Sequence, residues 1–113
     1  MFTKSMPISG FYMLDSNGDP VACEDREKFS IWCSTANRTV ARTEIAQVIV
    51  VTSFLMIDHN YSEQGDPILF ETMIFINNHG QLGDSIGYQE RYRTRAEAFE
   101  GHKRAIDWMR SQP

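Results

Sequence analysis

Residues 47–57 read Gln-Val-Ile-Val-Val-Thr-Ser-Phe-Leu-Met-Ile, and this stretch decides the fold because it is β-branched or large and apolar almost throughout. A run of this length and composition is typical of a central strand that is covered on both faces for part of its length. Residues 68–76, Ile-Leu-Phe-Glu-Thr-Met-Ile-Phe-Ile, form a second strong run after a polar loop. The two runs predict the centre of a β-sheet.

The N-terminal flank predicts a hairpin followed by a helix. Within residues 11–23, Asn17-Gly18 supplies the positive φ values that a type I′ turn requires. Residues 24–36 repeat apolar side chains at a spacing of three to four, and Asp25 is a suitable N-cap. This segment is therefore expected to form a short amphipathic helix.

Two further strands are predicted, one half exposed at residues 39–45 and one polar and at an edge at residues 88–93. The glycine-containing residues 77–87 are interpreted as a long connection between strands. Residues 94–110 predict a second helix, which opens with a capping box at Thr94.

Together these elements predict one α+β domain spanning residues 1–113. We expect a mainly antiparallel sheet of about four or five strands in sequence-neighbour order, with two helices packed on one face.

Composition narrows the classes of function. The net charge of −4 argues against a dedicated nucleic-acid binder, which would need clustered Lys and Arg. No apolar run approaches the ~20 residues of a membrane helix. Cys23 and Cys33 lie about 15 Å apart if helical, so they are interpreted as reduced thiols of a cytoplasmic protein. We expect no membrane association and no cofactor.

Polar, titratable side chains occur where the apolar pattern calls for core, which predicts a site. The candidate ligand- or partner-binding residues are Asp58, His59, Glu71, Arg91, Tyr92 and His102. In the second helix, His102 lies on the apolar face, and neighbouring Gly101 suggests a close approach of backbone to sheet or ligand. Alternation places Glu71 with Met73, so Glu71 is buried near His102 if the helices cover that face.

Three interpretations of these residues stay open. His59, Glu71 and His102 are chemically sufficient for a metal in a 2-His-1-carboxylate site, or for acid–base catalysis. Alternatively, Glu71 pairs with an arginine of a neighbouring strand, Arg91 or Arg93, while His102 satisfies a backbone carbonyl. The third interpretation is a noncatalytic binding pocket. No nucleophile-elbow, Walker or dinucleotide-binding motif is present, so we do not expect the protein to be an enzyme.

Several phrases of the chain resemble a family of small uncharacterised proteins common in bacteriophage and prophage genomes. In that family they run approximately FLGLDH, PLLFETMVF and RYxTxxEAxxGH, and here they fall in order between about residues 48 and 106. The chain departs from the pattern at Met56, where glycine is usual, and at Ile76-Asn77-Asn78, where a Gly-Gly turn often follows.

The resemblance implies a phage accessory protein that acts in the host cytoplasm. Small proteins of this kind often bind a host protein or sequester a signalling nucleotide, and we expect such binding to inhibit a host antiviral defence system. The alternatives are a metal-dependent enzyme using the His/Glu/His residues and a virion structural or assembly component. The polar edge strand and exposed aromatic side chains such as Trp32 and Trp108 favour a homodimer.

Overall fold

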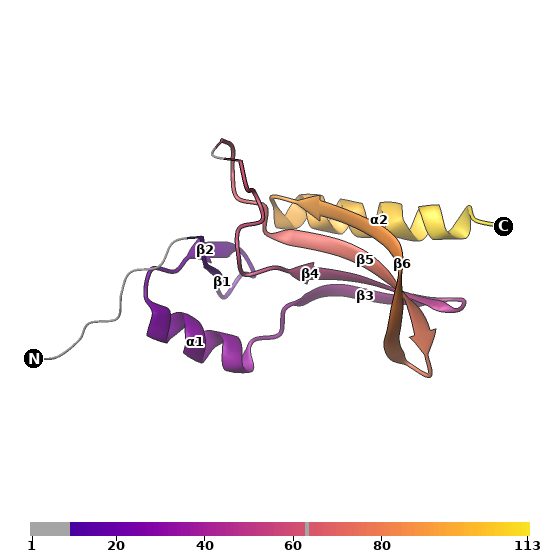
Figure 1. The fold of residues 1–113 in the computed structure, drawn as a ribbon, viewed down its shortest axis with the longest axis horizontal. Helices are drawn as coiled ribbons and strands as arrows, with labels where there is room; N and C mark the ends of the chain where they lie inside the picture. Colours follow the sequence, from indigo (N-terminus) through magenta and orange to yellow (C-terminus); the bar gives the residue numbers. More distant parts are fainter. Residues whose placement is uncertain (1–9, 63) are drawn as a thin grey trace, which may run out of the picture.

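The computed structural model describes residues 10–62 and 64–113 and has the predicted α+β architecture (Figure 1). The elements in chain order are β1 (Tyr12–Leu14), β2 (Pro20–Ala22), α1 (Arg26–Thr35), β3 (Thr39–Ile45), β4 (Val48–Phe54), β5 (Phe70–Asn78), β6 (Gln81–Tyr92) and α2 (Arg95–Arg110). Strands β3 to β6 form one antiparallel sheet in sequence order, and β1 and β2 form a separate hairpin. The predicted class, antiparallel pairing and neighbour order are confirmed.

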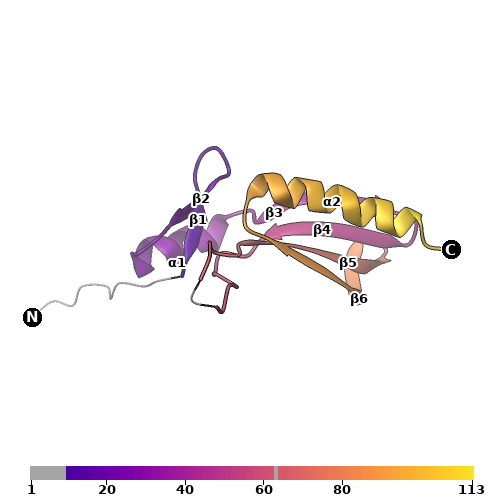
Figure 2. The ribbon, with the colours of Figure 1, turned by 90° about the horizontal axis from the view of Figure 1, so that it is seen from above.

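Helix α2 lies along one face of the four-stranded sheet (Figures 1 and 2). It begins with the predicted capping box, in which Thr94 accepts from the Glu97 amide and the Glu97 side chain returns to the Thr94 amide. Its buried side is narrow and made of small residues with one imidazole: Ala98, Gly101, His102 and Ala105. Small residues let the helix axis approach the sheet closely.

On the face of the sheet that α2 covers, apolar residues of β4 lie opposite apolar residues of β5. The register pairs Val50 with Ile74 and Phe54 with Phe70, and all four are almost completely buried. Because side chains alternate along a strand, the residues between them face the opposite side of the sheet. The core therefore sits between α2 and the even-numbered residues of β4 and β5.

Helix α1 and the β1–β2 hairpin lie at the end of the sheet where α2 begins (Figure 1). Asp25 caps α1 as predicted, accepting from the amides of Glu27 and Lys28. The helix contacts β1, and its Trp32 packs edge-on against Phe54 with ring centroids 5.9 Å apart. Trp32 thus belongs to the core and is not the exposed aromatic that the sequence suggested.

The predicted connection at residues 77–87 was wrong. Strand β5 continues to Asn78, a tight turn at His79 and Gly80 follows, and β6 begins at Gln81. Both turn residues have positive φ, 54° and 85°, as a two-residue hairpin turn requires. Two register shifts bend the hairpin, whose tip turns to the side of the sheet away from α2 (Figure 1). There Arg42 Nη2 donates to the Gly80 carbonyl at 2.8 Å.

None of the helices in the described residues is both long and apolar enough to cross a lipid bilayer.

Candidate functional site

Glu71 and His102 lie on opposite faces of the sheet. Alternation does place Glu71 with Met73, but α2 covers the other face, formed by Phe70, Thr72 and Ile74. The expectation that Glu71 is buried near His102 is therefore wrong. The reason is that both faces of β5 carry large apolar residues, so the strand pattern alone does not tell which one receives the helix.

His59 and Asp58 stabilise the loop after β4. The His59 Nδ1–H donates to the Ile57 carbonyl at 2.7 Å, and the Asp58 carboxylate accepts from the amides of Asn60 and Ile68 at 2.7 and 2.9 Å. Across residues 10–62 and 64–113, no group of three or more His, Cys, Asp or Glu side chains is placed to hold a metal ion. The structure therefore does not assemble the His59, Glu71 and His102 arrangement.

Glu71 pairs across the strand with Arg91, as the second interpretation predicted. The Arg91 Nε–H donates to the Glu71 carboxylate at 2.9 Å, and the Gln89 amide donates to the same oxygen at 2.7 Å. The Glu71 side chain is 13% exposed, so these donors compensate a largely desolvated charge.

His102 belongs to a buried chain of hydrogen bonds beneath α2. The imidazole is 6% exposed and meets Thr43 Oγ1 with Nε2 at 2.9 Å and Thr52 Oγ1 with Nδ1 at 2.8 Å. Thr52 Oγ1 lies 2.5 Å from Thr72 Oγ1, and the Tyr92 hydroxyl donates to Thr72 at 3.0 Å. These five side chains, Thr43, Thr52, Thr72, Tyr92 and His102, are called the threonine network below.

The threonine network is satisfied by a neutral imidazole. With its proton on Nε2, His102 donates to Thr43 and accepts from the Thr52 hydroxyl at Nδ1. Thr52 then accepts from Thr72, which accepts from Tyr92, so every hydroxyl proton of the buried part of the chain has an acceptor. The partners of His102 are thus hydroxyl groups, and not the backbone carbonyl that the sequence suggested.

Gly101 explains how Tyr92 reaches this network. A Cβ at position 101 would overlap the phenol ring and hydroxyl of Tyr92, so only glycine lets the ring lie under the helix backbone. Burial raises the pKa of the Tyr92 hydroxyl, which keeps it a donor to Thr72. The close approach predicted at Gly101 is therefore confirmed, with the sheet residue Tyr92 as the group that approaches.

The neutral state of His102 predicts that the protein loses stability in acid. Burial lowers the pKa of His102 below 6.5, so the unfolded chain binds a proton more readily than the folded one as pH falls below about 6.5. Stability attributable to this group is present above that pH and is lost below it, by at most about 1.4 kcal/mol between pH 7.5 and 5.5. Urea unfolding of the wild type and His102→Gln at both pH values measures the difference. An equal loss in both proteins would contradict the prediction.

The threonines of this network were not among the candidate residues. Their signal was in the sequence, because Thr52 and Thr72 alternate in phase with the apolar residues Val50, Phe54 and Ile74. A hydroxyl at a core-facing position needs a partner, and two of them on adjacent strands supply one to each other.

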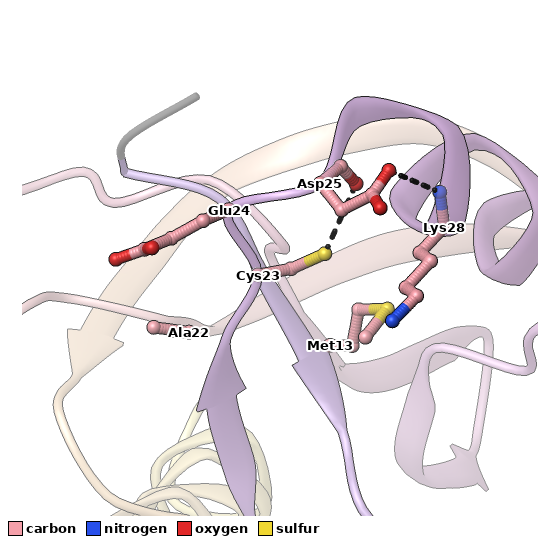
Figure 3. Close-up of a pocket in the computed structure, with 6 residues that line it drawn as sticks. All are labelled: Met13, Ala22, Cys23, Glu24, Asp25 and Lys28. Carbon is pink, nitrogen blue, oxygen red and sulfur yellow. Dashed lines mark hydrogen bonds between the residues drawn. The ribbon is translucent and has the colours of Figure 1, made fainter. Parts of the chain in front are cut away.

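A cavity of about 480 Å³ lies between the hairpin and the start of α1 (Figure 3). Met13, Cys23, Asp25 and Lys28 are among its lining residues. The Cys23 thiol donates to the Asp25 carbonyl at 3.3 Å, while the Asp25 carboxylate accepts from the first amides of α1. Those two polar groups are thus engaged in holding the start of the helix, and we assign no chemistry to this cavity.

The face of the sheet away from α2 is organised in rows that run across the strands. In the first two of the three rows given next, the edge strands β3 and β6 contribute polar residues and β4 and β5 contribute apolar ones, whereas the third row is polar throughout. The rows are Arg42, Val51, Met73 and Gln89; Glu44, Ile49, Phe75 and Ser85; and Ser53, Glu71 and Arg91. This surface is called the open face below. Its β4 residues Ile49 and Val51 are buried, on the side to which the β5–β6 hairpin tip turns, whereas Met73 and Phe75 on β5 are half-buried. Two ion pairs flank these residues.

The protein is therefore an α+β protein in which α2 covers one face of the four-stranded sheet. Within the described residues, every buried polar side-chain atom has a hydrogen-bond partner. Comparisons with models of protein families, with curated proteins and with solved structures found no match to the chain.

Proposed function

We propose that the chain is a noncatalytic accessory protein of a bacteriophage that binds a host protein through the open face, in the host cytoplasm. The observation that carries the proposal is the distribution of side chains on this face. An apolar centre at Met73 and Phe75 is bordered by charged side chains on the two edge strands. Protein interfaces have the same anatomy, an apolar centre within a polar rim.

Charge on the open face favours a partner recognised by shape and apolar contact. Arg42 pairs with Glu44 at 3.2 Å and Arg91 pairs with Glu71 at 2.9 Å, so the charges of the rim are compensated within the protein. A partner therefore does not need to supply a strongly charged surface. We expect it to insert an aliphatic or aromatic side chain over Met73 and Phe75, where desolvation yields most binding energy.

The phage origin rests on the resemblance of residues 48–106, and inhibition of a host defence system is the purpose we propose. The three residues considered for catalysis all have structural partners: His59 donates to the Ile57 carbonyl, Glu71 is paired with Arg91, and His102 is enclosed in the threonine network. We therefore place the proposed binding on the open face and not on these three side chains as a group. The homodimer stays a prediction, and Trp108, 40% exposed, remains its candidate aromatic contact.

Replacing Met73 with arginine will weaken binding of the host partner. Arginine at the centre of the open face places an unpaired charge where the partner's apolar side chain is desolvated, so we expect binding to weaken at least tenfold, about 1.4 kcal/mol or more. Tagged wild-type and variant proteins are used to capture partners from host lysate. The recovered partner is then purified, and its dissociation constant is measured by calorimetry.

Ile31→Arg is the matched control, because Ile31 is 64% exposed on α1, at the end of the sheet. It should change the dissociation constant by less than about twofold. Urea unfolding confirms that both variants remain folded. The proposal fails if no partner is recovered by the wild type, or if Met73→Arg and the wild type bind the recovered partner equally.

A further inference from the structure

Two arginines face a pocket of about 340 Å³ where three distant parts of the chain meet. The pocket is lined by residues of the β1–β2 turn, the end of the loop that follows β4, and the junction of β6 with α2. Arg93 and Arg95 line it from the junction, and Tyr12 and Leu69 contribute apolar walls. Its volume is in the lower range of small-molecule sites.

Both guanidinium groups are held by backbone and not by carboxylates. The Arg93 Nε–H donates to the Asp66 carbonyl at 3.1 Å, and Arg95 Nη1 donates to the Asn17 carbonyl at 3.2 Å. Among the residues that the structure describes, no ion pair involves either arginine. A neutral carbonyl fixes the position of a guanidinium and leaves most of its five N–H donors available. The Arg95 guanidinium also lies over the Phe99 ring, 5.0 Å from its centroid, which orients the group without occupying its N–H donors.

Glycines in the two loops make this arrangement possible. A Cβ at Gly18 would lie 3.0 Å from the Arg95 Cζ, and a Cβ at Gly65 would lie 3.4 Å from the Arg93 Nη2. Both glycines have positive φ. Each loop therefore approaches one guanidinium closely with bare backbone, so the arginines are positioned rather than left to move freely in solvent.

The pocket also contains hydrogen-bond acceptors. Asp19 and Asp66 line it, and neither forms an ion pair within the described residues, although two arginines are nearby. At the start of α2 the Thr94 side chain already accepts from the Glu97 amide, so we assign no role in ligand binding to the amides of this helix. The ligand should thus combine an oxyanion for the arginines, hydroxyl or amine donors for the carboxylates, and an apolar ring for the walls.

We propose that this pocket binds a nucleoside monophosphate, with the phosphate held by Arg93 and Arg95. The ribose hydroxyls or base amino groups donate to Asp19 and Asp66, and the base lies against the wall formed by Tyr12 and Leu69. Guanidinium groups suit this role because they bind phosphate oxygens in bidentate fashion. The site is separate from the open face, and it stands or falls independently of the host-protein proposal.

Calorimetry with the four ribonucleoside 5′-monophosphates tests the site. We expect at least one of them to bind at least tenfold more tightly than inorganic phosphate and than the matching nucleoside, because only the nucleotide engages both ends of the pocket. A wild-type protein that binds none of the four at about 1 mM would overturn the proposal. So would inorganic phosphate, or a phosphoserine peptide, that binds as tightly as the best nucleotide.

Variants of the two arginines test the end of the pocket that is proposed to bind the phosphate. Arg93→Gln and Arg95→Gln should each weaken the nucleotide at least tenfold, and Arg95→Lys should restore only part of the loss because lysine lacks the planar fork. Arg110→Gln, an exposed position at the other end of α2, is the matched control and should leave binding unchanged. Urea unfolding without ligand shows whether each variant is folded, and equal nucleotide binding by folded Arg93→Gln and Arg95→Gln would overturn the assignment.

Removal of a carboxylate should change the affinities for inorganic phosphate and for the nucleotide in opposite directions. Asp66→Ala removes a negative charge near the phosphate and an acceptor for the nucleoside, so inorganic phosphate should bind more tightly and the nucleotide less tightly. A variant that binds both ligands more tightly would overturn the nucleotide assignment. The Met73→Arg protein should bind nucleotide as the wild type does, which distinguishes failure of this site from failure of the open face.

Discussion

Gly101→Ala will lower the free energy of unfolding by about 3 kcal/mol, although alanine is the better helix former by about 1 kcal/mol. The added methyl group has no room, because it would overlap the ring and hydroxyl of Tyr92. Either α2 must move away from the sheet or Tyr92 must leave its position and abandon Thr72. Urea unfolding, with its midpoint and slope, measures the loss.

The companion experiment removes the obstacle. In a Tyr92→Leu background the phenol is gone, so Gly101→Ala should cost less than about 1 kcal/mol, and the double-mutant cycle should give a coupling of about 2 kcal/mol or more. Glu100→Ala, at the exposed neighbouring position, is the control and should change stability by less than about 0.5 kcal/mol. Additive effects of the Gly101 and Tyr92 changes would show that the close approach is not what requires glycine. If Gly101→Ala alone does not fold, recovery of folding in the double variant provides the same test.

His102→Ala will destabilise the protein by about 3 kcal/mol, because it leaves a cavity, removes the acceptor of the Thr52 hydroxyl proton and removes the partner of Thr43. The imidazole bridges Thr43 on β3 and Thr52 on β4, so its loss also removes the buried polar link between α2 and these two strands. His102→Gln should cost less, about 1 kcal/mol, because the amide fills part of the space and keeps one hydrogen bond. Chemical unfolding at pH 7.5 compares both variants with the wild type.

His59→Ala is the appropriate control, because that imidazole makes a single hydrogen bond in a loop and should cost less than about 1 kcal/mol. Equal costs for His102→Ala and His59→Ala would contradict a supporting role for the threonine network. Binding provides a second readout. A folded His102→Gln protein should keep full affinity for both the host partner and the nucleotide, since neither the open face nor the two-arginine pocket contains His102.

Much of the local structure could be predicted from short-range chemistry. The N-cap at Asp25 and the capping box at Thr94 each depend on residues within a few positions of one another. The central strands depend only on composition and alternation. Such features can be predicted from a sequence because the interactions that stabilise them join residues close together in the chain. A tight turn does join β1 and β2, but the predicted type I′ turn at Asn17-Gly18 is wrong: only Gly18 has positive φ, and the Gly18 amide donates to the Asp15 carbonyl across a three-residue loop.

The secondary structure of polar segments was harder to predict from the sequence. The first half of β6 contains Gly83, Asp84, Ser85 and Gly87, a composition that predicts a connection, yet it pairs with the end of β5 across a two-residue turn. Strand formation there is imposed by pairing with a strong neighbour, which overrides the weak propensity of the residues themselves. The bend in the hairpin and its contact with Arg42 depend on register shifts that leave no separate mark in the sequence.

The sequence by itself determined the class of the domain, the order and antiparallel pairing of its central strands, and the orientation of His102 toward the sheet. Only the tertiary structure decided which face of the sheet α2 covers, and this placed Glu71 and His102 on opposite sides. The physical reason is that alternation defines two faces without ranking them. Met73 and Phe75 are as apolar as Phe70 and Ile74, so the choice depends on how the small residues of α2 fit around Tyr92 and the buried threonines.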